Sequence, residues 1–156
     1  MRPLTEEETK ILFEKLANYT TDLKPLIAPL SDSPDADRYV FRLIKDRVQT
    51  LKFRLHITAL PILAAHARYK IWIKPNGVMP FLYGSHISKA HVGRWTEDCP
   101  SNVGVIVYDM SDSPIGFGVS ARSTAEARRL DPTGIVVFRQ ADCGEYLRDE
   151  DTLFAG

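Results

Sequence analysis

The chain has 156 residues, of which 44% are hydrophobic and 26% are charged. This composition is typical of a folded globular protein and excludes a disordered chain, and the length suits one large domain or two small ones. Twenty lysines and arginines balance twenty aspartates and glutamates. No broad basic field therefore draws the chain to nucleic acid, and any such contact must be local.

The cysteines and the N-terminal stretch indicate a cellular compartment. Cys99 and Cys143 are too few for a disulfide framework and lack CxxC spacing, which favours a reducing environment. The first ten residues, MRPLTEEETK, contain no apolar segment of the signal-peptide kind, and no apolar run approaches membrane length. We therefore expect a soluble intracellular protein without membrane contact.

The first half of the chain predicts helices and strands in alternation. Thr5 and Glu8 form a capping box, and the apolar spacing that follows predicts a helix from about residue 5 to 20. Proline and aspartate then predict a loop to about residue 38. Two strands are expected over 38–48 and 51–58, where apolar and polar residues alternate in the second.

Two features of this half concern its connections. Only Gln49 and Thr50 separate the predicted strands, and neither tolerates the positive φ of a two-residue hairpin. After the second strand, Thr58 is expected to cap a short apolar helix over 59–69, with Pro61 accommodated in its first turn. The junction at 48–51 is therefore an unusual one.

From Tyr69 onward, short strands and turns predict a small β barrel. One strand, over 69–74, ends at the turn signal Pro75-Asn76-Gly77, and a short helix capped by Ser123 or Thr124 is expected before Pro132. Further strands are expected over 102–110, 114–122 and 134–142. Gly116 and Gly118 leave a bare stripe of backbone on one strand, for which tight packing inside the barrel is the favoured interpretation.

Residues 81–95, FLYGSHISKAHVGRW, concentrate polar and aromatic side chains. His86 and His91 lie five positions apart, which does not suit two metal ligands on one helical face, and nothing completes a zinc site. Cys143, and Ser85 next to His86, are the only candidate nucleophiles, and we interpret them as a buried cysteine and a loop serine. The acidic run over 145–152 is expected to be a solvated tail. We expect no metal, no cofactor and no catalytic set.

The same stretch suits RNA better. Lys89 and Arg94 can contact phosphates, Tyr83, His91 and Trp95 offer stacking faces, and the backbone at Gly84 allows close approach. Aromatic residues at such positions are also common in the core or at the edge of a barrel. From the residues alone, RNA contact and a purely structural strand remain equally supported.

Longer motifs resemble a known family. KPNGVMPFLYGSHISKAHVGRW, GVIVYDMSDSPIGFGVSARS and PTGIVVFRQADCGEYLRDEDTLF resemble a PUA domain, a small RNA-binding β barrel. RPLTEEETK and KFRLHIT in the first half are similar to the eukaryotic Nip-seven family of large-subunit biogenesis factors. The resemblance implies an α+β fold, with an N-terminal α/β domain and antiparallel sheet over 1–68 and a PUA barrel over 69–156.

The resemblance also implies a function. Members of this family are nucleolar 60S assembly factors, needed for processing of 27S pre-rRNA and without catalytic activity. We accordingly expect a nuclear, nucleolar monomer whose partners are pre-rRNA, pre-60S particles and other assembly factors. The PUA positions where RNA usually binds correspond here to Tyr83, Gly84, Ser85, Lys89, His91, Arg94, Arg139 and Gln140.

Two alternatives stay open: a scaffold that binds only proteins of the pre-60S particle, and a PUA-tethered RNA-modifying enzyme. One departure from the family is clear, because an extra block between the motifs KDRV and KFRLHIT is replaced here by QTL, at 49–51. We therefore interpret the unusual junction as a missing piece. A chain that is truly shortened would lack a strand of its N-terminal sheet and expose apolar surface.

Overall fold

The computed structural model describes residues 2–3, 5–20, 42–43 and 55–148. The predicted loop to residue 38, most of the strand over 38–48, the junction at 48–51 and the start of the strand over 51–58 lie outside the described residues. At the N-terminus, strand β1 (Arg2–Pro3) pairs with β2 (Arg42–Leu43) in an antiparallel two-stranded sheet. The antiparallel pairing expected for this half is present in that sheet.

Helix α1 (Glu6–Leu16) begins as the sequence predicts. The Thr5 side chain accepts a hydrogen bond from the Glu8 amide, and the Glu8 carboxylate accepts one from the Thr5 amide. The helix ends at Leu16 rather than near residue 20, and a turn then places Tyr19 in the core. Leu12 and Leu16 are buried, whereas Ile11 is 42% exposed.

Residues 57–65 form helix where part of a strand was predicted. A 3-10 turn, η1 (Ile57–Ala59), leads directly into α3 (Leu60–Ala65), so the strand over 51–58 is wrong at Ile57 and Thr58. Thr58 does not cap α3, because Ala59 occupies the cap position, while Pro61 lies in the first turn as predicted. Ile57 is fully buried, so it contacts the core from a helical turn instead of from a strand.

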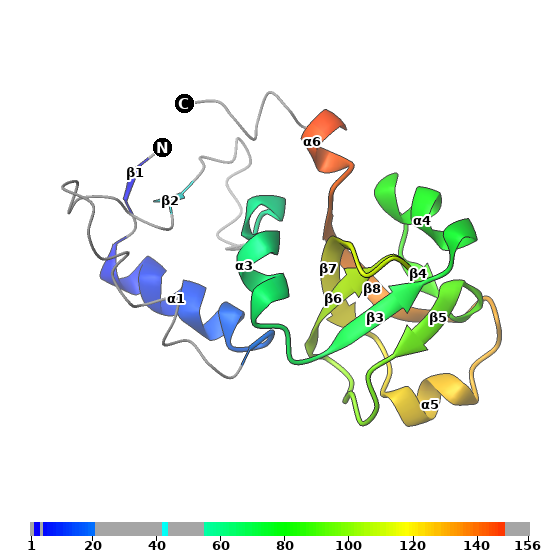
Figure 1. The fold of residues 1–156 in the computed structure, drawn as a ribbon. Coiled ribbons are helices and arrows are strands. Elements are labelled where there is room, and N and C mark those ends of the chain that lie inside the picture. The colour runs from blue at the N-terminus through cyan, green and yellow to red at the C-terminus, as the bar shows by residue number, and fades with distance from the viewer. Residues whose placement is uncertain (1, 4, 21–41, 44–54, 149–156) are drawn as a thin grey trace.

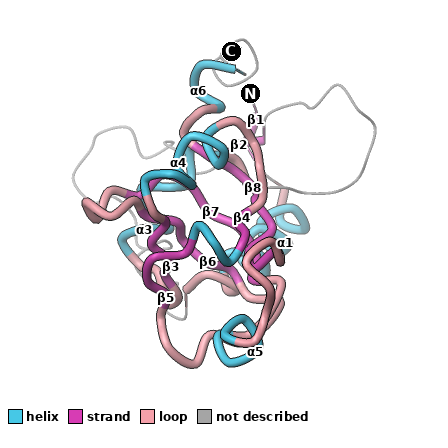
Figure 2. The backbone as a smooth tube through the Cα atoms, turned by 90° about the vertical axis from the view of Figure 1, so that its right-hand side faces the viewer, coloured by secondary structure: helices cyan, strands magenta, loops and turns pink. Residues whose placement is uncertain are grey.

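The rest of the described chain forms a nearly closed six-stranded barrel (Figures 1 and 2). Its strands are ordered β4-β8-β7-β6-β3-β5, and all neighbours are antiparallel except β3 and β6. A 3-10 turn, η2 (Lys89–His91), joins the two end strands. The α+β class with a PUA-like barrel is therefore confirmed. The strands are β3 (Lys70–Ile73), β4 (Ile87–Ser88), β5 (Val92–Trp95), β6 (Gly104–Tyr108), β7 (Pro114–Ser120) and β8 (Ile135–Asp142).

Three short helices decorate the barrel. α4 (Pro75–Leu82) begins where a turn was predicted, because Pro75 opens the helix and Gly77 leaves room for the His91 side chain. α5 (Thr124–Arg128) has Ser123 as its cap, in agreement with the sequence, and ends well before Pro132. α6 (Glu145–Arg148) replaces the start of the predicted solvated tail, and Glu145 is buried.

Two clusters of buried side chains form the core. One fills the barrel. The other joins the two halves of the chain, because α1, η1 and α3 pack on the outer face of β6, β7 and β8 (Figure 1). Its fully buried members include Leu16, Ile57, Ile106 and Phe117. The tight packing expected at Gly116 and Gly118 is confirmed, since a Cβ at either would collide with the β8 backbone.

Candidate nucleic-acid interface

The loop after α4 presents an aromatic side chain to solvent. Tyr83 caps the helix and is 73% exposed, and Gly84 follows with φ +97°, a conformation that favours glycine. The amides of Gly84 and Ser85 donate to the Phe81 and Pro80 carbonyls at 2.9 and 3.0 Å. These bonds fold the chain back sharply at the end of the helix, so Tyr83 and Ser85 face solvent.

Further exposed aromatic and apolar groups adjoin this loop. The His86 ring meets the edge of the Phe138 ring at 5.4 Å and 88°, and Phe138 is 46% exposed on β8. Met79 lies one helical turn before Tyr83 and is 56% exposed. We call Met79, Tyr83, Ser85, His86 and Phe138 the rim. It offers planar stacking faces and apolar area, which suit unpaired bases.

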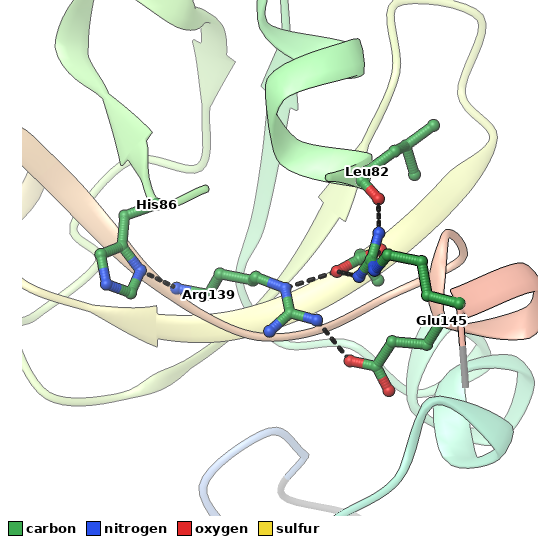
Figure 3. Close-up of polar contacts among 6 residues, drawn as sticks. Leu82, His86, Arg139 and Glu145 are labelled. Carbon is green, nitrogen blue, oxygen red and sulfur yellow. Dashed lines mark hydrogen bonds and ion pairs between the residues drawn. The ribbon is translucent and has the colours of Figure 1, made fainter. Parts of the chain in front are cut away.

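Arg139, predicted to contact RNA, does not point freely into solvent. Its guanidinium donates to the Asp142 and Glu145 carboxylates, and only 15% of its side chain is exposed (Figure 3). Its backbone amide donates to His86 Nδ1 at 3.0 Å. Both carboxylates are close enough to neutralise the cation in the free chain, and RNA contact at this position stays a prediction.

Lys89 and His91 are also held by protein groups. The Lys89 ammonium donates to the Arg128 and Leu130 carbonyls at 2.8 and 2.5 Å, and so satisfies the carboxyl end of α5. His91 Nδ1 lies 3.3 Å from Ser88 Oγ, and its Cβ packs close to Gly77. Both residues therefore stabilise the η2 turn and are not part of the rim.

The last two predicted site residues lie elsewhere on the barrel. Arg94 stacks over the Trp72 ring at 4.0 Å and pairs with Asp112 at 3.2 Å, on the β5 side of the sheet. The Gln140 side chain accepts a hydrogen bond from the Tyr19 hydroxyl, at the contact between α1 and the barrel. The structure thus brings together Tyr83, Gly84 and Ser85, with Arg139 behind them, and separates Arg94 and Gln140 from that group.

Sequence reasoning missed part of the rim and the ionic network beneath it. Phe138 follows Val136 and Val137, which are both buried, so strict alternation gives no reason to expect it outside. A register shift between β4 and β8, at Val136, breaks the alternation there. The ion pair between Asp142 and Arg148 could not be predicted from the sequence, because it depends on the turn that follows β8.

Neither cysteine has the environment of a nucleophile. Burial raises the pKa of the Cys143 thiol, and the nearby Asp142 and Glu145 carboxylates raise it further. Burial likewise raises the pKa of Cys99. Reactive thiols need positive neighbours that lower the pKa, which is the opposite arrangement. Among the residues that the structure describes, no three His, Cys, Asp or Glu side chains gather as metal ligands would, and no helix could cross a membrane.

Cys143 should therefore alkylate slowly near neutral pH. In the native chain at pH 8, we expect iodoacetamide to react several-fold more slowly than in the chain unfolded in urea, because less thiolate is present. The rate should still be rising above pH 9, where an ordinary cysteine levels off. Mass spectrometry of the modified peptide measures it, with Cys143→Ser reporting the background from Cys99. A native rate equal to the unfolded one would contradict this account.

Comparisons with known proteins agree on the family. A family model described as the UPF0113 PUA domain matches residues 69–151. The 60S ribosome subunit biogenesis protein nip7 of Schizosaccharomyces pombe is 55% identical, with 99% of this chain and 100% of that protein covered. The NIP7 protein of Saccharomyces cerevisiae is 54% identical, with 99% of each covered.

Solved structures support the fold. A hypothetical protein from Pyrococcus horikoshii matches with a TM-score of 0.61 at 14% identity, over 96% of this chain and 98% of that one. A conserved PUA domain protein from Thermoplasma acidophilum matches with a TM-score of 0.51 at 13% identity, over 58% of this chain and 61% of that one. At these identities the likeness concerns the fold alone.

The alignment lengths bear on the missing block. The alignment with the Schizosaccharomyces pombe protein spans 184 positions, whereas this chain has 156 residues, so at least 28 positions have no counterpart here. A missing block would produce such a difference in length, and its location at 48–51 stays a prediction. Nevertheless, the relatives align with both halves of this chain, and the domain match covers the second half. The chain belongs to the NIP7 family of 60S ribosome subunit biogenesis proteins and carries that family's PUA domain.

Proposed function

We propose that this protein is a non-catalytic assembly factor of the 60S ribosomal subunit that contacts pre-rRNA through the rim of its PUA barrel. Family membership supports the role in subunit assembly. The role places the protein in the nucleus and nucleolus, as a monomer bound to pre-60S particles during processing of 27S pre-rRNA. The raised pKa of Cys143 and of Cys99 agrees with a factor that has no covalent chemistry of its own.

The observation that carries the RNA contact is the exposure of Tyr83 on a sharply folded loop. An aromatic ring that is 73% exposed has no stabilising role in the barrel core, yet it is available for a base to stack on. His86 and Phe138 extend the same surface. Because the neighbouring cations Lys89 and Arg139 are held by protein groups, stacking rather than charge should dominate the binding.

Sedimentation tests the proposal in its cellular setting. The tagged protein should migrate with pre-60S particles in nuclear extracts on a sucrose gradient, and ribonuclease treatment should return much of it to the top. Migration with free protein before ribonuclease treatment would reject the assembly role itself.

Tyr83→Ala tests the rim directly. Loss of one stacking platform should weaken binding to a short single-stranded RNA by about 1–3 kcal/mol, with an unchanged melting temperature because the ring lies in solvent. Tyr69 packs against the barrel core, so Tyr69→Ala would disturb the core and is not a suitable control. The matched control is Met110→Ala, because Met110 is also more than half exposed but lies in the turn between β6 and β7. Fluorescence anisotropy measures both. Equal affinity of parent and Tyr83→Ala would remove Tyr83 from the interface.

One observation favours a second candidate, a scaffold that binds proteins only. Met79 in the rim and Ile135 at the start of β8 are exposed apolar side chains, with 56% and 41% of their area exposed, and exposed apolar area is also typical of protein interfaces. On that account, association with the particle would survive ribonuclease, and the purified chain would not bind single-stranded RNA. Other nucleolar assembly factors would then be the direct partners.

A further inference from the structure

The loop that carries Tyr83 is held at Leu82 by the side chain of Arg148, which belongs to an ionic network, and at His86 by the backbone amide of Arg139. We propose that Asp142, Arg139 and Arg148 are positioning residues for RNA binding: they hold the Tyr83–Ser85 loop in its binding shape and do not themselves contact phosphate. This inference rests on the proposed function, since it concerns how the rim is presented to RNA.

The first end of the loop is held at the last residue of α4. The Arg148 side chain, on α6, donates through Nη1 to the Leu82 carbonyl (Figure 3). A carbonyl in the last turn of a helix has no partner within the helix, and a cation there is also favoured by the helix dipole. Arg148 therefore joins α6 to the point at which the loop begins.

The second end is held at His86. Its Nδ1 accepts a hydrogen bond from the Arg139 amide at 3.0 Å, while its ring contacts Phe138. The bond joins the loop to β8, so the chain from Leu82 to His86 spans two anchored points. Between them, Gly84 takes its positive φ with the Arg139 guanidinium close by.

Asp142 connects the two anchors. Both of its carboxylate oxygens accept from Arg148 Nη2 at 3.0 Å, and one also accepts from Arg139 Nε. The carboxylate has no exposed area. Glu145 completes the set by pairing with Arg139. Two cations thus face two carboxylates. Such a cluster fixes the positions of its side chains and adds little net charge.

The arrangement predicts a distinctive effect of substitution. A loop released from one anchor must be ordered again when RNA binds, so affinity falls. The dependence of affinity on salt should stay the same, because no phosphate contact is lost. Removal of a true phosphate contact would instead lower the slope by about 0.7 for single-stranded RNA.

The test uses the full chain and a short fluorescein-labelled single-stranded RNA over a series of salt concentrations. For Arg148→Gln we expect affinity to fall about tenfold, the cost of ordering roughly one backbone residue, with an unchanged slope. Arg148→Lys keeps the charge but lacks the fork that reaches Leu82 and Asp142 together, and it should be weakened as well. Arg129→Gln, which removes an exposed arginine from the end of α5, is the control and should bind as the parent does.

Backbone dynamics provide a second readout that does not depend on RNA. The ¹⁵N order parameter of Gly84 should be about 0.85 in the parent and in Arg129→Gln, and should fall toward 0.6 in Arg148→Gln. An ordered Gly84 in Arg148→Gln, a lower salt slope, or full affinity of Arg148→Lys would each overturn the inference. If the parent itself does not bind RNA, the proposed function fails, and the order of Gly84 alone decides whether the network positions the loop.

Discussion

Replacement of Leu16 by alanine should destabilise the entire chain, including the barrel, by about 2–5 kcal/mol. Leu16 is fully buried on the face of α1 that packs, with Tyr19 and Leu63, against Ile106 and Phe117 of the barrel. The cavity left behind would therefore lie in a core that both halves of the chain share. A single cooperative transition should report the loss, because the two halves share this buried cluster.

The measurement is chemical denaturation followed both by tryptophan fluorescence and by far-ultraviolet circular dichroism. Trp72 and Trp95 lie on barrel strands, so fluorescence reports on the barrel. Ile11→Ala, in the same helix but 42% exposed, is the matched control and should cost far less. If Leu16→Ala leaves the tryptophan transition unchanged, then residues 69–156 fold independently and the shared core contributes little.

Asp142→Asn should cost about 3–5 kcal/mol, since it removes the carboxylate from a buried site and leaves Arg139 without one of its partners. Asparagine has nearly the same shape, so the loss would come from charge rather than from packing. Thermal melts measure it, with Asp131→Asn, an exposed aspartate near α5, as the control.

A double variant sharpens this prediction. Once Arg148→Gln has removed one of the two arginines, Asp142→Asn should cost less than it does in the parent, because part of the buried positive charge is already gone. Strict additivity of the two substitutions would show that Asp142 and Arg148 do not interact, against the 3.0 Å contacts between them.

Local chemistry could be predicted from the sequence where one residue type decides the structure. The capping boxes at Thr5 and Ser123 fix the starts of α1 and α5 through bonds that involve only neighbours in the chain. The strands β6, β7 and β8 were predicted as well, because short apolar or alternating runs lie there between turn signals. These elements depend little on distant partners.

The errors occur where a pattern suits two structures. Pro75-Asn76-Gly77 is a turn signal, but Pro75 is equally suited to the first position of a helix, and the space left by Gly77 is filled by His91. At Ile57, apolar residues at every second position suggested a strand. Pro61 favours the start of a helix, however, and a helical structure forms there. At Gly77 a contact remote in sequence selects the outcome, whereas at Ile57 a neighbouring proline does.

The candidate site was predicted in its backbone and not in its charges. Gly84 was expected to allow close approach of its backbone, and the structure places it in a sharp loop beside the exposed Tyr83. A sequence shows that Arg139 is positive but not which carboxylate lies beside it. Asp142 and Glu145 follow Arg139 within six residues. The chain turns back after β8, and their carboxylates then neutralise the Arg139 guanidinium.

Ultraviolet crosslinking on pre-60S particles tests the central claim most directly. RNA crosslinked to the full chain would be digested and the modified peptides identified by mass spectrometry. The rim account predicts adducts on the peptide that contains Tyr83 and His86, with further adducts at Phe138, and their loss in Arg148→Gln particles. Adducts confined to the β5 side around Trp72 and Arg94, or their absence from particles that still contain the protein, would contradict it.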